Sequence, residues 1–117
     1  MKHTARILLL ALLVISLASA AAAEDKKDEK LDGKALYVAM CKVCHDEDAD
    51  AGEYTPMDLI MEQWDTFFDE DYLPAHEEAK YEDDSSVVET LTPEMLKAIR
   101  QFCVDGAADS EHPMTCG

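Results

Sequence analysis

Residues 41–45 read Cys41-Lys42-Val43-Cys44-His45, and this stretch decides what the chain can be. The spacing Cys-x-x-Cys-His is the attachment signature of a c-type haem. Two thiols three positions apart lie about one helical turn from each other, so both can form thioether bonds along one haem edge. The imidazole of His45 then follows in the position from which it can bind the iron as proximal ligand.

Two other interpretations of this motif have less support. A zinc half-site would need a second Cys or His pair at ligand spacing, but the next cysteine is Cys103. A thioredoxin-like dithiol normally lies beside a βαβ pattern, and no β-rich pattern surrounds the motif. The sequence therefore predicts one haem c, held covalently by Cys41 and Cys44.

Residues 1–23 have the organisation of a secretory signal peptide. Two basic residues precede an apolar run at 7–17, and the small residues at 18–23 contain A-x-A-like cleavage patterns. The apolar run is too short to span a bilayer comfortably, and the region contains no cysteine that could carry a lipid. We expect cleavage after Ala23 and a mature protein without a membrane anchor in the periplasm, or otherwise exported.

The mature chain would be small and strongly acidic. Residues 24–117 comprise 94 residues, in which 8 basic side chains face 26 acidic ones, a net charge of −18. This charge excludes nucleic acid and an anionic membrane surface as partners. It favours redox partner proteins with a basic docking surface, because attraction between opposite charges raises the rate of encounter. We expect a charged N-terminal extension at 24–31 and one domain at 32–117.

Three helices are predicted within this domain. Asp32 is a suitable N-cap for the first helix, which would carry the haem motif at its C-terminal end. Thr55-Pro56 predicts the start of a second helix with a wide apolar face that reaches Phe68. Thr92-Pro93 predicts the start of a third helix, which would end near Gly106.

Two loops are expected to join these helices. Residues 46–53 are mostly acidic and lack apolar periodicity, which is typical of a solvated loop. Residues 69–91 also lack clean periodicity, and we expect a long loop there with a turn or two of helix near residues 75–81. Long loops in compact domains are commonly functional, and this one would have to pass over the haem.

With these residues in view, the chain resembles the class I monohaem cytochromes c. Residues 32–37, which run into the haem motif, resemble the first helix of that family, and residues 92–104 resemble its closing helix. The resemblance implies an all-α, class I cytochrome c-like fold with about three helices packed around one covalently bound haem. It also implies an electron carrier whose two axial iron positions are both filled.

The second axial ligand departs from the family pattern. Members of the family usually present a methionine from the loop before the last helix, but no methionine occurs between Met61 and Met95. The strongest neutral ligand in that stretch is His76, and we predict that it binds the iron opposite His45. The alternatives left open are Met57, Met61, Met95, His112, Met114 and an open sixth site.

The other two cysteines, Cys103 and Cys116, are expected to form a disulfide, because the export signal places the chain in an oxidising compartment. Closing a loop of this size contributes about 3 kcal/mol. The predicted function is electron transfer rather than enzymatic catalysis. Two alternatives remain: a small haem enzyme or gas or redox sensor with an open or displaceable sixth site, and a haem subunit of a larger redox complex.

Overall fold

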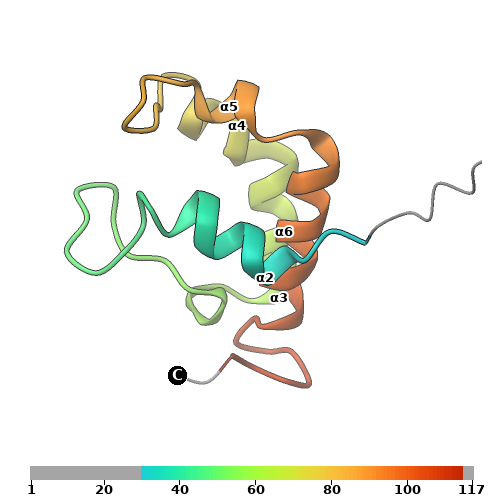
Figure 1. Ribbon diagram of the computed structural model, residues 1–117. Helices are drawn as coiled ribbons and strands as arrows, with labels where there is room; N and C mark the ends of the chain where they lie inside the picture. Colours follow the sequence, from blue (N-terminus) through green and yellow to red (C-terminus); the bar gives the residue numbers. More distant parts are fainter. Residues whose placement is uncertain (1–29, 115–117) are drawn as a thin grey trace, which may run out of the picture.

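The computed structural model describes residues 30–114 (Figure 1). The predicted signal peptide, most of the charged extension and Cys116 lie outside the described residues. Within 30–114 the chain is helical and contains no β-strand, only an isolated bridge between Lys80 and Ser86. The all-α class is therefore confirmed for this part of the chain. None of the helices in it is long and apolar enough to cross a membrane.

The first helix begins where the sequence predicts. It comprises α2 (Gly33–Leu36), which continues directly into the π-helical turn η1 (Tyr37–Cys41). Asp32 is the N-cap, and its side chain accepts a hydrogen bond of 3.1 Å from the backbone N–H of Ala35. The wider turn is closed by a bond from the Lys42 N–H to the Tyr37 carbonyl, five residues earlier. The haem motif thus leaves the helix through a π turn, a feature that often occurs at functional sites.

The second helix differs from the prediction at its start. Thr55 and Asp58 form a capping box, but the turn that they cap is only the short 3-10 helix η2 (Pro56–Asp58). Leu59 and Ile60 are extended, and the long helix starts at Met61. Thr55 therefore does begin a helical turn, as predicted, but this turn is only three residues long. At the start of the long helix the Ile60 N–H donates to the Gln63 side chain at 3.1 Å.

The second helix also continues further than predicted. It runs through α3 (Met61–Thr66), the π-helical turn η3 (Phe67–Asp71) and α4 (Tyr72–His76). The expected loop over 69–91 is therefore wrong at residues 69–74 and again at Val87–Thr90, and of the helical turn expected near 75–81 only residues 75–76 are helical. Pro74 is the reason that a loop was expected, because a proline inside an α-helix clashes with the carbonyl four residues earlier. The wider turn just before Pro74 lets the helix continue.

The C-terminal part follows the predicted pattern. After a short α5 (Val87–Thr90), α6 (Pro93–Asp105) begins at Thr92, whose hydroxyl accepts from the Met95 N–H at 3.2 Å. Gly106 is the C-cap. The first helix crosses α6, α3 also packs against α6, and α4 lies beside α5 (Figure 1). The buried core between these helices consists of Tyr37, Trp64, Tyr72, Val87, Leu91, Ile99, Cys103 and Ala107.

Candidate functional site

A cavity of about 540 Å³ lies between the first helix, the α3–α4 helix and α6. Its volume is in the range of small-molecule and cofactor sites. Most of its wall is apolar, and aromatic side chains supply much of it: Tyr37, Tyr54, Trp64, Phe67, Phe68 and Tyr72. Trp64 is fixed in this wall because its indole N–H donates to the Pro56 carbonyl at 2.8 Å. The cavity offers a large flat apolar group a mostly apolar environment.

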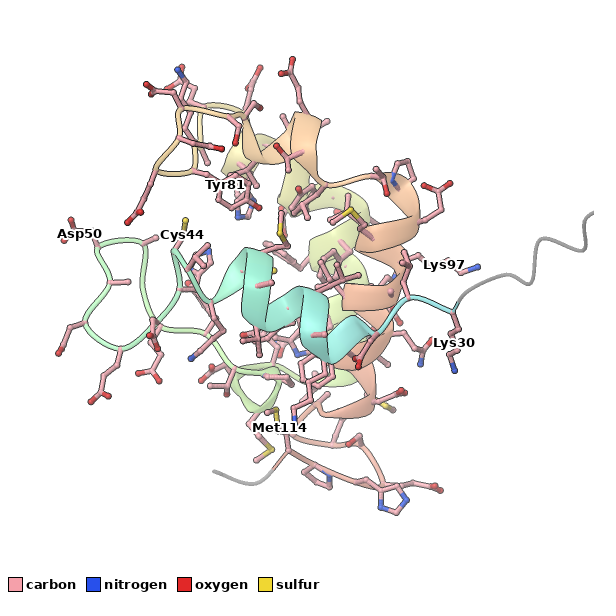
Figure 2. All side chains as sticks on the ribbon, viewed as in Figure 1. Lys30, Cys44, Asp50, Tyr81, Lys97 and Met114 are labelled. Atoms are coloured by element: carbon pink, nitrogen blue, oxygen red, sulfur yellow. The ribbon has the colours of Figure 1, made fainter. Side chains whose placement is uncertain are left out.

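Both cysteines of the motif line this cavity. Cys41 and Cys44 are half-buried, and the backbone N–H groups of Cys44 and His45 both donate to the Cys41 carbonyl, at 3.1 and 3.0 Å. Burial, and secondarily the neighbouring Cys44 thiol, raises the pKa of Cys41 to about 11. Figure 2 places Cys44 toward the side of the molecule that carries Asp50 and Tyr81. The two sulfur atoms are thus available along one edge of the cavity.

The ring of His45 is held in one orientation. Its Nδ1 lies 2.9 Å from the carbonyl oxygen of Gly52. A carbonyl can only accept a hydrogen bond, so Nδ1 carries the proton and the lone pair is on Nε2. Gly52 has φ +86°, a backbone conformation that residues other than glycine rarely adopt. The acidic loop therefore turns back at a glycine and presents a carbonyl to the motif histidine.

His76 is held in the same way from the opposite wall. Its Nδ1 lies 2.8 Å from the Tyr72 carbonyl, one turn earlier in α4, so its Nε2 also has a free lone pair. The ring stacks on that of Tyr72, with centroids 4.8 Å apart and 29° between the planes. Metal-binding histidines characteristically donate their other ring N–H to a carboxylate or backbone carbonyl. Both histidines therefore have the hydrogen-bonding pattern of metal ligands.

The two imidazoles lie close together in the cavity wall in an edge-to-face arrangement, with ring centroids 6.0 Å apart and an angle of 76° between the ring planes. A metal–imidazole bond of about 2 Å places each ring centre about 3 Å from the metal, so two rings on one metal are about 6 Å apart. The observed separation therefore leaves room for one metal ion between the two rings.

The methionines weighed as alternatives lie elsewhere. Met57 and Met61 are 40 % and 38 % exposed, and neither lines the cavity. Met95 is half-buried against the core but is not part of the cavity wall. His112 is exposed, and Met114 follows it in the C-terminal segment, where its N–H donates to the Gly106 carbonyl. Of the candidates for the second ligand, the cavity brings only His76 to His45.

Several residues of the wall were not singled out from the sequence, among them Tyr54, Leu59, Tyr72 and Val87. Tyr72 is the most informative of them, because it is 8 % exposed and its buried hydroxyl has no hydrogen-bond partner in residues 30–114. Its position four residues before His76 is the one signal that could have identified it, since such pairs share a helix face.

Cys103 is fully buried and also lines the cavity. Burial, followed by the effect of the Cys41 thiol, raises its pKa to about 12. Its expected partner, Cys116, lies outside the described residues, so the Cys103–Cys116 disulfide stays a prediction. Met114 is the last described residue before Cys116, and its N–H donates to the Gly106 carbonyl at 3.0 Å.

No family model, no curated protein and no solved structure matches this chain. In residues 30–114, the side chains of His, Cys, Asp and Glu do not gather in groups of three or more that could hold a metal ion by themselves. The sequence motif and the geometry of the cavity are therefore the two observations that bear on function.

Proposed function

We propose that this protein is an exported electron carrier with one haem c, attached through Cys41 and Cys44 and ligated by His45 and His76. The observation that carries the proposal is the pair of neighbouring imidazoles, with ring centroids 6.0 Å apart, each held through Nδ1 by a backbone carbonyl. When bound, the haem supplies an iron that changes its oxidation state by one electron. No side chain is then required to act as acid, base or nucleophile.

The chain's own residues have three tasks under this proposal. The two cysteines hold one edge of the group, and the apolar wall excludes water from it. The hydrogen bonds at Nδ1 orient both rings and increase the electron-donating strength of Nε2. Because a methionine ligand raises the potential of c-type haems, two histidines favour a lower potential than the His/Met pair usual in the resembled family.

The distribution of charge supports docking of a basic redox partner near the cysteine edge. The loops at 46–53 and 80–86 project from the same side of the molecule (Figure 1). Both loops are rich in carboxylates. The lysine at or near the start of each loop is paired with one of these carboxylates, Lys42 with Asp46 and Lys80 with Asp84. Attraction between such a surface and a basic partner accelerates encounter and weakens as salt increases.

One observation favours a second candidate function, a sensor or enzyme with a displaceable sixth ligand. The unpartnered hydroxyl of Tyr72 is buried beside His76. A buried hydroxyl without a partner costs about 1–3 kcal/mol, and a polar molecule that replaced His76 on the metal could accept its hydrogen bond. Under this alternative His76 leaves the site during function; under the leading proposal it stays.

Visible spectroscopy of the holoprotein, with and without carbon monoxide, separates these functions. A six-coordinate low-spin iron in both oxidation states, with slow or no carbon monoxide binding, is expected of the electron carrier. Rapid carbon monoxide binding by the unmodified protein would favour the sensor or enzyme. His76→Ala should yield a high-spin or ligand-exchanged iron, whereas the matched control Met61→Ala should keep the wild-type spectrum. An unchanged spectrum and potential in His76→Ala would remove this residue from the iron.

A further inference from the structure

Arg100 of α6 forms a clamp on the helix that carries His76. Its Nε donates to Asp65 Oδ1 at 2.7 Å, and its two terminal nitrogens donate to the two carboxylate oxygens of Asp69 at 2.6 and 3.1 Å. This is the two-pronged arrangement that a guanidinium makes best and that a lysine cannot reproduce. Asp65 lies just before the π turn η3 and Asp69 lies within it. The clamp therefore spans the entry to the wide turn.

The π turn determines which way His76 points. Trp64 and His76 are twelve residues apart, and at about 100° per residue a regular α-helix would place them about 120° apart around its axis. A π turn accommodates one extra residue, which reduces this angle to about 20°. In the structure the Tyr72 N–H indeed bonds to the Phe67 carbonyl, five residues earlier, and both Trp64 and His76 line the cavity.

We propose that Arg100 is a positioning residue, which holds the π turn at 67–71 and thereby the helix register in which His76 faces His45. The proposal rests on the proposed function, because it takes His76 to be the second iron ligand.

Arg100 is needed for this register because π turns are rare and need support from their surroundings. Without the guanidinium, the carboxylates of Asp65 and Asp69 would repel each other, since like charges four residues apart destabilise a helix. Relaxation of the turn to regular α-helix would rotate His76 by about 100°, away from the cavity. Loss of the clamp should therefore loosen the iron–His76 bond rather than only lower the stability of the fold.

The test compares the rates at which carbon monoxide binds to the reduced holoprotein in wild type, Arg100→Gln and Arg100→Lys. Lys97→Gln is the charge-matched control, because it removes one cation from an exposed position of the same helix. Detachment of His76 limits binding to a six-coordinate iron, so we expect a rate that is faster by about two- to fivefold in Arg100→Gln, the factor that loss of partly exposed ion pairs corresponds to. Arg100→Lys should be intermediate, and Lys97→Gln should match wild type.

A second readout is amide hydrogen exchange over residues 71–76, which should accelerate in Arg100→Gln and remain unchanged in Lys97→Gln. A variant that destabilises α6 away from the clamp, Val104→Ala, controls for a general loss of stability. If Arg100→Gln does not fold, Asp69→Asn removes one side of the clamp and takes its place.

Two results would overturn the proposal in distinguishable ways. An Arg100→Gln protein that is less stable but binds carbon monoxide at the wild-type rate would show that Arg100 only holds the helices together. A His76→Ala protein with a wild-type spectrum would instead show that the proposed ligation is wrong. In the first case the function proposed above stands, and in the second it needs a different ligand.

Discussion

Replacing Gly33 by alanine should separate the two helices that cross at this residue. A Cβ atom built at Gly33 would lie 2.1 Å from the carbonyl oxygen of Ala98 and 3.0 Å from the Cβ of Phe102. The closest contact is with the backbone of α6, which cannot turn aside as a flexible side chain would. The first helix would therefore have to move away from α6, and with it the haem motif at its other end.

The size of the effect follows from two opposing terms. A carbon–oxygen contact needs more than 3 Å, so the helices must separate locally by about 1 Å; overpacking of this kind typically costs about 1–3 kcal/mol. Alanine is better than glycine inside a helix by about 1 kcal/mol, but Gly33 is the first helical residue and gains less. We expect a net loss of about 2 kcal/mol, together with weaker packing of the Tyr37–Phe102 ring pair, whose centroids are 5.3 Å apart.

The assay is guanidinium-induced unfolding of the holoprotein, followed by circular dichroism and by haem absorbance. Gly33→Ala should shift the midpoint to lower denaturant without a change of slope, and it should lower Tm by about 10 °C. Lys34→Ala, at the adjacent exposed position, is the matched control and should change stability by no more than about 0.5 kcal/mol. A Gly33→Ala protein as stable as wild type would refute the close crossing of these helices.

Four further outcomes are expected. Cys41→Ala combined with Cys44→Ala should abolish haem that survives denaturing electrophoresis, and retention of covalent haem would contradict the attachment site. Mass spectrometry of unreduced holoprotein should find Cys103 and Cys116 joined; two alkylatable thiols in fresh protein would exclude the disulfide. Burial raises the pKa of Tyr81 to about 12 from its ordinary 10.0, so its contribution to stability should be complete below pH 10 and decline toward pH 12, a slope that Tyr81→Phe should reduce. Electron transfer to a basic redox protein should slow as salt increases, and Asp50→Lys should lower the low-salt rate; a rate insensitive to both would exclude charge-guided docking.

The sequence alone was sufficient for the features that depend on neighbouring residues. The Cys-x-x-Cys-His motif is a five-residue pattern, and the caps at Asp32 and Thr92 act on N–H groups three residues away. Both caps occur where they were predicted, and so does the end of the last helix at Gly106, while the first helix ends at Cys41, before the rest of the motif that it was predicted to carry. The all-α class is confirmed for residues 30–114. Signals of this kind are legible because the interacting groups are close in the chain.

The tertiary structure decided the course of the middle segment. Thr55-Pro56 starts only one turn, and Pro74, which in sequence argues for a loop, is tolerated because a π turn precedes it. The extra residue in that turn breaks the 3.6-residue periodicity on which helix prediction depends. Which residues face the cavity beyond Phe67 therefore could not be read from spacing alone.

Which of the candidate ligands lies beside His45 was likewise determined by the tertiary structure. Topological position pointed to His76, but it did not exclude Met57 or Met61, which sequence reasoning placed on the apolar face of a helix beginning at Pro56. The structure instead puts Met57 in an exposed 3-10 turn and Met61 at an exposed helix start. A residue's direction depends on the rotation accumulated along its helix and on the contacts that fix that rotation, here between Arg100 and carboxylates more than thirty residues away. Such contacts join distant parts of the chain, so only the folded structure reveals them.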